Sequence, residues 1–138
     1  MTAYIDTSAL LRLVLQEQGA LDELRSFDAL VSSELTAVEG LRTIDRLRLG
    51  GALTVEEAAV QGAAVTAWLE AIDLILIRPV VLNRASGPLP TSLGTLDAIH
   101  LATALVWRER MALPLVVATH DTALATAART HGFEVRGA

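Results

Sequence analysis

The chain has 138 residues, of which 52% are hydrophobic and only 4% aromatic, so aliphatic side chains must supply the core of the one domain we expect over residues 1–138. The absence of cysteine excludes disulfides and thiolate metal sites, and no apolar run is long enough to cross a membrane. The net charge of -5 argues against a nucleic-acid binder that relies on a broad basic surface. The N-terminus resembles no secretion signal, so we expect a cytoplasmic protein.

Short apolar runs alternate with longer helical patterns from one end of the chain to the other. The expected strands cover residues 3–5, 29–32, 74–77, 115–118 and 133–135. The expected helices follow a cap at Thr7 or Ser8, a cap at Ser33, a capping box at Thr54 and a cap at Gly94 or Thr95, with further short helices near 21–25 and 80–85 and a last one over 122–130. Continuous apolar strands between helices predict an α/β fold, with a parallel sheet of four to five strands covered on both faces.

Four carboxylates fall where a predicted strand or helix cap gives way to a helix: Asp6, Glu39, Asp97 and Asp121. In open α/β sheets, sites form outside the carboxyl ends of the strands. Acidic groups brought together repel one another unless a cation neutralises them, and oxygen-only ligation suits Mg²⁺ or Mn²⁺. Such ions assist the hydrolysis of phosphodiesters. The spacing alone is weak support for a site, because any α/β domain carries Asp at strand ends as helix caps.

Taken together, the segments around these acids resemble the PIN-domain family, and specifically VapC-type toxins of toxin–antitoxin pairs. The four segments are Tyr4–Leu10 around Asp6, Ser32–Arg42 around Glu39, Leu96–Ala102 around Asp97 and Thr119–Leu124 around Asp121. The resemblance implies a three-layer α/β/α sandwich with a five-stranded parallel sheet and a Mg²⁺- or Mn²⁺-dependent endoribonuclease. It implies that the four acids form the metal site and that the hydroxyls of Ser8 and Thr119 orient carboxylates.

The same resemblance implies two protein partners, a VapB-type antitoxin that inhibits the enzyme and a second copy of the chain in a homodimer. Apolar positions on two helices predict an interface, because they exceed what one small sheet can cover. These positions are Leu13, Leu41, Ile44 and Leu47. The RNA substrate would need a local set of arginines, for which Arg12, Arg42 and Arg46 are candidates by their nearness in sequence to the acids.

Two other functions stay open at this point. A degenerate PIN-like domain would bind proteins without catalysis, although all four acids are retained. A phosphatase of the haloacid-dehalogenase type would use Asp6 as nucleophile, but that family needs a second Asp where this chain has Ser8. Near the acids, His100 is interpreted as a packed or hydrogen-bonding residue and His120 as a loop residue at the rim of the cleft.

Overall fold

The computed structural model describes residues 1–138 and contains one five-stranded sheet in which every pairing is parallel. The spatial order of the strands is β3-β2-β1-β4-β5. Their bounds are β1 Thr2–Ile5, β2 Ala29–Ser33, β3 Asp73–Ile75, β4 Val116–Ala118 and β5 Glu134–Arg136. The order reverses direction between β1 and β4, which makes the carboxyl ends of these two strands the switch point where open α/β sheets bind ligands.

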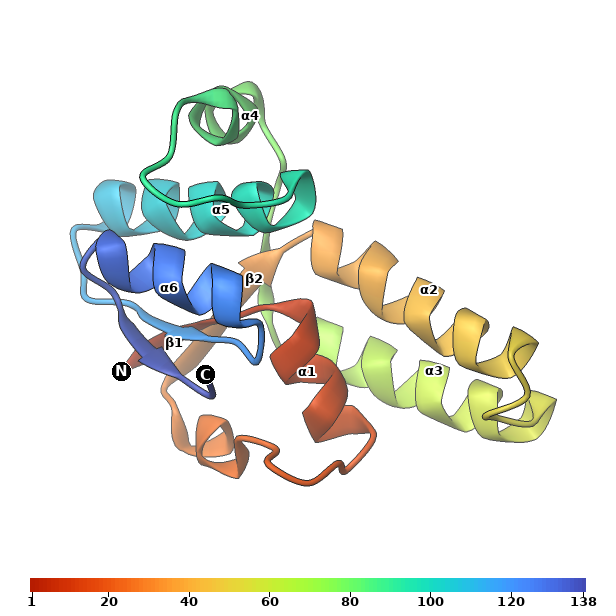
Figure 1. Ribbon diagram of the computed structural model, residues 1–138. Coiled ribbons are helices and arrows are strands. Elements are labelled where there is room, and N and C mark those ends of the chain that lie inside the picture. The colour runs from red at the N-terminus through yellow and green to blue at the C-terminus, as the bar shows by residue number, and fades with distance from the viewer.

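Helices cover both faces of the sheet, as Figure 1 shows. Their bounds are α1 Thr7–Val14, a short 3₁₀ turn η1 Asp22–Ser26, α2 Leu35–Leu49, α3 Val55–Glu70, α4 Pro79–Ser86, α5 Thr95–Met111 and α6 Thr122–Thr130. The predicted three-layer α/β/α sandwich is confirmed, with α1, α2 and α3 on one face and α5 and α6 on the other. No helix combines the length and apolar character that a membrane crossing requires.

The core divides at the sheet because successive residues of β1 point to opposite faces. Ala3 and Ile5 belong to the cluster under α1, α2 and α3, whereas Tyr4 belongs to the cluster under α5 and α6. α4 packs on the outer side of α5 through Val81, so α5 is buried from two sides. This position explains why α5 is apolar on nearly every face.

α2 and α3 lie side by side and extend away from the sheet (Figure 1). Gly40 permits this close approach, because a Cβ atom there would lie 3.3 Å from Cγ1 of Val65 on α3. The prediction that Leu13 and Ile44 belong to an interface is wrong, since both are buried core residues. The exposed apolar side chains of the two helices are Val38, Leu41, Leu49, Val55 and Val60.

Two local predictions are corrected by side-chain hydrogen bonds. The N-cap of α1 is Asp6 rather than Thr7 or Ser8, because its Oδ1 accepts from the backbone N–H of Ala9 at 2.9 Å. The third strand ends at Ile75 rather than at residue 77. Beyond that point the backbone N–H of Ile77 donates to Glu34 Oε1 at 2.9 Å, so the strand gains no further ladder bond there.

Candidate active site

The candidate site lies at the switch point of the sheet and is built first from the ends of β1 and β4. Asp6 directly follows β1, and its backbone N–H donates to the carbonyl of Ala118, the last residue of β4. Thr119 follows β4, and its backbone N–H donates to the carbonyl of Arg136 on β5. These bonds fix the two loops against each other, so the residues that start α1 and α6 meet at one edge of the sheet.

Asp6 is almost completely buried, with 3% exposure, and both of its carboxylate oxygens accept hydrogen bonds from the protein. Oδ1 accepts from the Ser8 hydroxyl at 2.7 Å and from the Ala9 N–H at 2.9 Å, and Oδ2 accepts from the Thr119 hydroxyl at 2.7 Å. Burial raises the pKa of Asp6 above its usual value, although these three donors act in the opposite direction. The structure therefore places both hydroxyls that were expected to orient a carboxylate on Asp6.

Glu39 comes from the first turns of α2 and is held by two side chains of other elements. Its Oε1 accepts from the Thr7 hydroxyl at 2.7 Å and lies 2.6 Å from Nε2 of His100 on α5. Burial alone would raise the pKa of Glu39, but the bonds with His100 and Thr7 outweigh burial and lower it. No bond engages Oε2 of Glu39, which leaves that oxygen available to a ligand.

His100 in turn contacts Tyr4, which lies in the middle of β1. The Tyr4 hydroxyl lies 2.6 Å from His100 Nδ1, and the two rings meet edge to face. Tyr4 has no exposed surface and His100 only 2%. The interpretation of His100 as a hydrogen-bonding residue is confirmed. Sequence reasoning missed Tyr4 and Thr7, because a contact between residues that are 96 positions apart, such as Tyr4 and His100, leaves no periodic signal.

Asp97 and Asp121 are half-buried, as is Glu39. Asp121 is the N-cap of α6, where its Oδ1 accepts from the Leu124 N–H at 2.8 Å. Asp97 lies in the first turn of α5 and accepts no hydrogen bond from another protein group. Burial and the charge of Asp121 raise the pKa of Asp97, Asp6 and Glu39 add smaller contributions, and only His100 opposes the shift. The other three predicted acids therefore lie near enough to affect Asp97 electrostatically.

Among the four acids, the atoms that the protein leaves free are both carboxylate oxygens of Asp97, Oε2 of Glu39 and Oδ2 of Asp121. Oxygen-only sets match hard cations such as Mg²⁺ and Mn²⁺. In the arrangement described, no three His, Cys, Asp or Glu side chains are gathered closely enough to hold a metal ion. Carboxylate oxygens are thus suitable ligands for a divalent ion. In this metal-free arrangement the carboxylates stay apart, as expected of like charges that repel one another.

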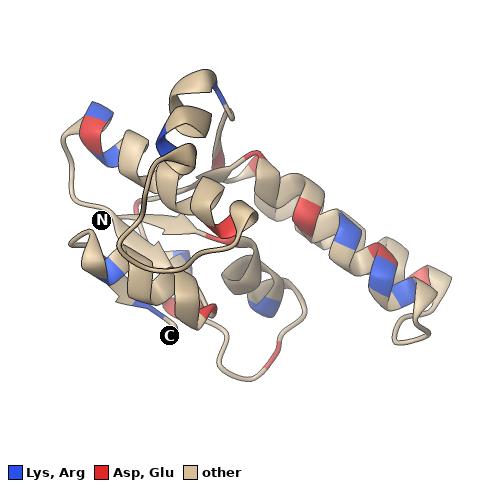
Figure 2. Ribbon diagram, turned by 45° about the horizontal axis from the view of Figure 1, so that its top comes forward, with Lys and Arg blue, Asp and Glu red and all other residues tan.

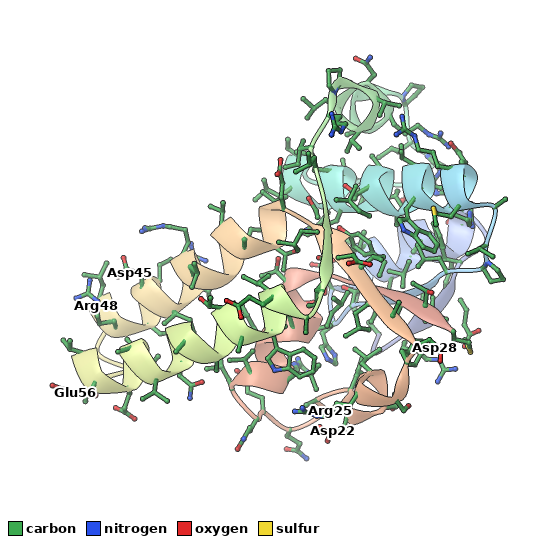
Figure 3. The ribbon with its side chains drawn as sticks, turned by 180° about the vertical axis from the view of Figure 1, so that it is seen from behind. Asp22, Arg25, Asp28, Asp45, Arg48 and Glu56 are labelled. Atoms are coloured by element: carbon green, nitrogen blue, oxygen red, sulfur yellow. The ribbon has the colours of Figure 1, made fainter.

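The three candidate arginines differ in their partners. Arg42 and Arg48 both pair with Asp45, at 3.2 and 2.8 Å, and Figure 3 shows Arg48 beside Asp45 on the part of α2 that extends from the sheet. Arg12 faces Glu17 at 4.0 Å. Arg46 is exposed and donates only to the Thr43 hydroxyl, at 3.0 Å, while its charge lowers the pKa of Glu39. Of the three candidates, Arg46 is therefore the cation near the acids without a carboxylate partner.

His120 lies in the loop between Thr119 and Asp121, next to the acids but not among them. Its backbone N–H donates to the Ser8 hydroxyl at 2.9 Å, which ties the loop to the start of α1. Its ring Nε2 is buried without a hydrogen-bond partner. The structure therefore gives His120 a role in fixing the loop through its backbone, and no contact with a carboxylate through its ring.

Comparison with known proteins gives similarities that run along almost the whole chain. A family model described as PIN domain matches residues 3–130. Ribonuclease VapC46 of Mycobacterium tuberculosis (strain ATCC 25618 / H37Rv) is 36% identical over 137 residues, which cover 96% of this chain and 94% of that protein.

Two solved structures share the fold at lower sequence identity. A toxin-antitoxin complex from Klebsiella pneumoniae aligns with a TM-score of 0.63 and 22% identity over 87% of each chain. PAE2754 from Pyrobaculum aerophilum aligns with a TM-score of 0.62 and 18% identity over 100% of this chain and 87% of that one. At these identities the likeness concerns the fold alone.

Proposed function

This chain belongs to the PIN-domain family, and from that premise we propose that it is a VapC-type endoribonuclease that depends on Mg²⁺ or Mn²⁺. The observation that carries the proposal is the convergence of Asp6, Glu39, Asp97 and Asp121 on one edge of a parallel sheet, where their charges interact. The 36% identical relative, which is aligned over nearly its whole length, is named a ribonuclease. Residues 1–138 would act as one PIN-like domain in the cytoplasm.

The metal would be held by the oxygens that the protein leaves free, those of Asp97, Glu39 and Asp121. Bound there, it would supply a water of lowered pKa and neutralise charge on the phosphate. Both oxygens of Asp6 already accept hydrogen bonds from the protein, so Asp6 would attract the ion by its negative charge without ligating it. An open arrangement is the expected metal-free state, because carboxylates without a cation repel one another.

The other residues of the site keep the acids ready for an ion. Ser8 and Thr119 keep Asp6 in one orientation, and Thr7 and His100 keep Glu39 in one orientation. An Asp6 nucleophile, as in haloacid-dehalogenase phosphatases, is disfavoured by its 3% exposure and by the donors on both oxygens. A substrate phosphate cannot reach a carboxylate in that state.

The substrate requires positive charge near the acids, because RNA carries one negative charge per phosphate. Figure 2 shows acidic and basic residues interspersed along α2, so the helix has no broad basic face. Arg46 is the exposed cation on this helix that acts on Glu39 and has no carboxylate partner. We therefore assign Arg46 to a phosphate of the RNA strand, on the side of the site where α2 leaves the sheet.

An antitoxin and a second copy of the chain would cover the exposed apolar side chains of α2 and α3. Val38 and Leu41, on α2 next to Glu39, are 61% and 43% exposed. Exposed apolar groups at this density are typical of protein interfaces. A similar fold occurs in the toxin-antitoxin complex from Klebsiella pneumoniae. Co-purification of the chain with the product of the adjoining gene tests the antitoxin part of the proposal.

The experiment that tests the activity is cleavage of a mixed-sequence RNA by the purified chain. We expect cleavage with Mg²⁺ or Mn²⁺ and none in excess EDTA. Asp97→Asn should be inactive with either ion, and Arg110→Gln, at the other end of α5, is the matched control that should stay active. Cleavage that persists in EDTA would overturn the metal mechanism. A wild-type protein that shows no cleavage and no response to either ion would indicate the protein-binding module instead.

A further inference from the structure

A line of two hydrogen bonds connects Tyr4 on β1 to His100 on α5 and His100 to Glu39 on α2. Both contacts in this line measure 2.6 Å, and each uses a different nitrogen of the His100 ring. We infer that Tyr4 and His100 are positioning residues, which hold Glu39 by one carboxylate oxygen and leave the other oxygen free. We infer also that Nε2 of His100 donates to Glu39 and that Nδ1 accepts from the Tyr4 hydroxyl.

The assignment of the proton follows from counting donors and acceptors. A carboxylate only accepts, so Nε2 of His100 must donate to Glu39 Oε1. A phenol at neutral pH has one proton to donate, and Tyr4 has no water at its hydroxyl because it has no exposed surface. If the Tyr4 hydroxyl donates to Nδ1, every group in the line is satisfied. The Tyr4 contact therefore selects the Nε2–H form of the ring.

The line also explains why only one oxygen of Glu39 is engaged. Oε1 receives both the His100 proton and the Thr7 hydroxyl, from α5 and α1 respectively. These two donors use the lone pairs of Oε1, so the carboxylate cannot turn without losing both. Oε2 accepts no hydrogen bond from the protein. α5 thus supplies Asp97 directly and fixes Glu39 indirectly through His100, which lies one turn after Asp97.

A purely structural histidine would not need this arrangement. The other buried residues of this helix are Ala, Leu, Val and one Thr, and an apolar side chain at position 100 would fill the space without burying two ring nitrogens. The inference rests on the proposed function to the extent that Glu39 is taken as a metal-site acid. Its test is therefore divided into one part without metal and one part with metal.

The first part measures the ring tautomers by ¹⁵N NMR of the metal-free protein, above the ordinary pKa of histidine. The chain has three histidines, and His131 provides an internal reference. His131 Nδ1 lies 2.9 Å from the carbonyl of Ala127, which can only accept, so His131 should be the Nδ1–H form. We expect His100 to show the opposite form, Nε2–H, and Tyr4→Phe to make it populate both forms.

The second part measures binding of Mn²⁺ alone by water-proton relaxation in three variants. His100→Met removes the donor to Glu39, and affinity should fall on the order of 10- to 100-fold, as for other outer partners of metal ligands. His100→Gln restores an N–H at a similar reach and should recover most of the affinity. Thr103→Val removes another buried hydroxyl of α5, one that bonds only the Ile99 carbonyl, and should leave affinity unchanged.

The two parts separate failure of the inference from failure of the proposed function. A His100 ring protonated on Nδ1 or on both nitrogens, or one indifferent to Tyr4→Phe, would overturn the inference whatever the protein does with RNA. Equal Mn²⁺ affinity in His100→Met and Thr103→Val would overturn it as well. A wild-type protein that binds no Mn²⁺ and cuts no RNA would remove the proposed function, and the NMR result alone would then decide how Glu39 is held.

Discussion

Asp6 and Asp97 differ in how the protein satisfies their charges, although they lie in the same group of acids. Asp6 is buried, and Ser8, Ala9 and Thr119 donate to it. Asp97 is half-buried, accepts no hydrogen bond and faces three other carboxylates. Asp6 is part of the folded framework, whereas the charge of Asp97 has no hydrogen-bond donor within the protein. The comparison separates a residue held by the protein, Asp6, from a residue that is free to bind a ligand, Asp97.

The largest expected effect is the loss of RNA cleavage when either Asp6 or Asp97 is replaced by Asn. The two variants should differ from each other in stability. Asp6→Asn and Asp97→Asn should each lower the RNA cleavage rate by more than about 100-fold, because outer partners of metal ligands already cost 10- to 100-fold. Asp6→Asn should also destabilise the metal-free protein by about 1–2 kcal/mol, since its amide group opposes a hydroxyl donor. Asp97→Asn should leave the melting temperature level or raise it. A metal-free Asp97→Asn protein that melts several degrees lower would make Asp97 a structural residue.

Replacing Thr119 tests whether the hydrogen bonds to Asp6 stabilise the folded protein. Thr119→Val removes a fully buried hydroxyl that donates to Asp6 and accepts from the Asp121 N–H at 3.0 Å. Because two partners are left unsatisfied, we expect the free energy of unfolding to fall by about 1–3 kcal/mol. Chemical denaturation would measure this, with Thr103→Val as the buried-hydroxyl control. Equal losses in both variants would mean that Thr119 does not hold Asp6.

Stabilisation by Mg²⁺ tests whether Asp97 binds the metal ion. At ten times its dissociation constant, Mg²⁺ should stabilise the wild type by roughly 1.4 kcal/mol. For a chain of this length, that corresponds to a rise in melting temperature of about 3–6 °C. Asp97→Asn should lose most of this rise. Thermal melts with Mg²⁺ and with EDTA measure the effect, and an equal rise in both proteins would remove Asp97 from the site.

Arg46 should contribute a smaller effect on RNA affinity. Removing one phosphate contact should make the slope of log affinity against log salt shallower by about 0.7, equivalent to about fivefold in affinity near 0.1 M salt. Fluorescence anisotropy of a labelled RNA, in the inactive Asp97→Asn background, measures the slope for Arg46→Gln. Arg110→Gln serves as the control. The same slope in both variants would exclude a phosphate contact at Arg46.

The smallest effect concerns the pH dependence of the metal-free protein. A raised pKa means that the folded state holds the proton of Asp97 more tightly than the unfolded chain does. The free energy of unfolding therefore falls as the pH rises from the usual Asp value of 3.8 through the folded pKa. The advantage of Asp97→Asn over the wild type should grow over that interval and stay below about 1 kcal/mol, because water screens a half-exposed charge. Thermal melts of both proteins in EDTA across this pH range measure the difference. A stability advantage of Asp97→Asn that shrinks as the pH rises would contradict a raised pKa of Asp97.

The strands, and the positions of Asp6 and Asp121 just beyond two of them, illustrate what the sequence predicts. Apolar runs such as residues 115–118 are local signals, and Asp6 and Asp121 come shortly after two of them, so the strands and this edge of the sheet could be predicted. The cap of α1 was assigned one or two residues late, since Asp, Thr and Ser are all good caps and only the backbone decides among them. The Tyr4–His100 contact could not be predicted, because it depends on how β1 and α5 cross.

Asp6 and Asp121 are each the N-cap of a helix as well as an acid of the proposed site. Asp97 is an acid of that site and caps no helix, since α5 begins at Gly94 without a side-chain cap. A genetic selection for survivors of the expressed toxin would therefore yield an uneven set of mutants. Replacements at 6 or 121 would often remove the folded protein together with its activity. Survivors that still accumulate intact protein, and still bind the antitoxin, should concentrate at codon 97.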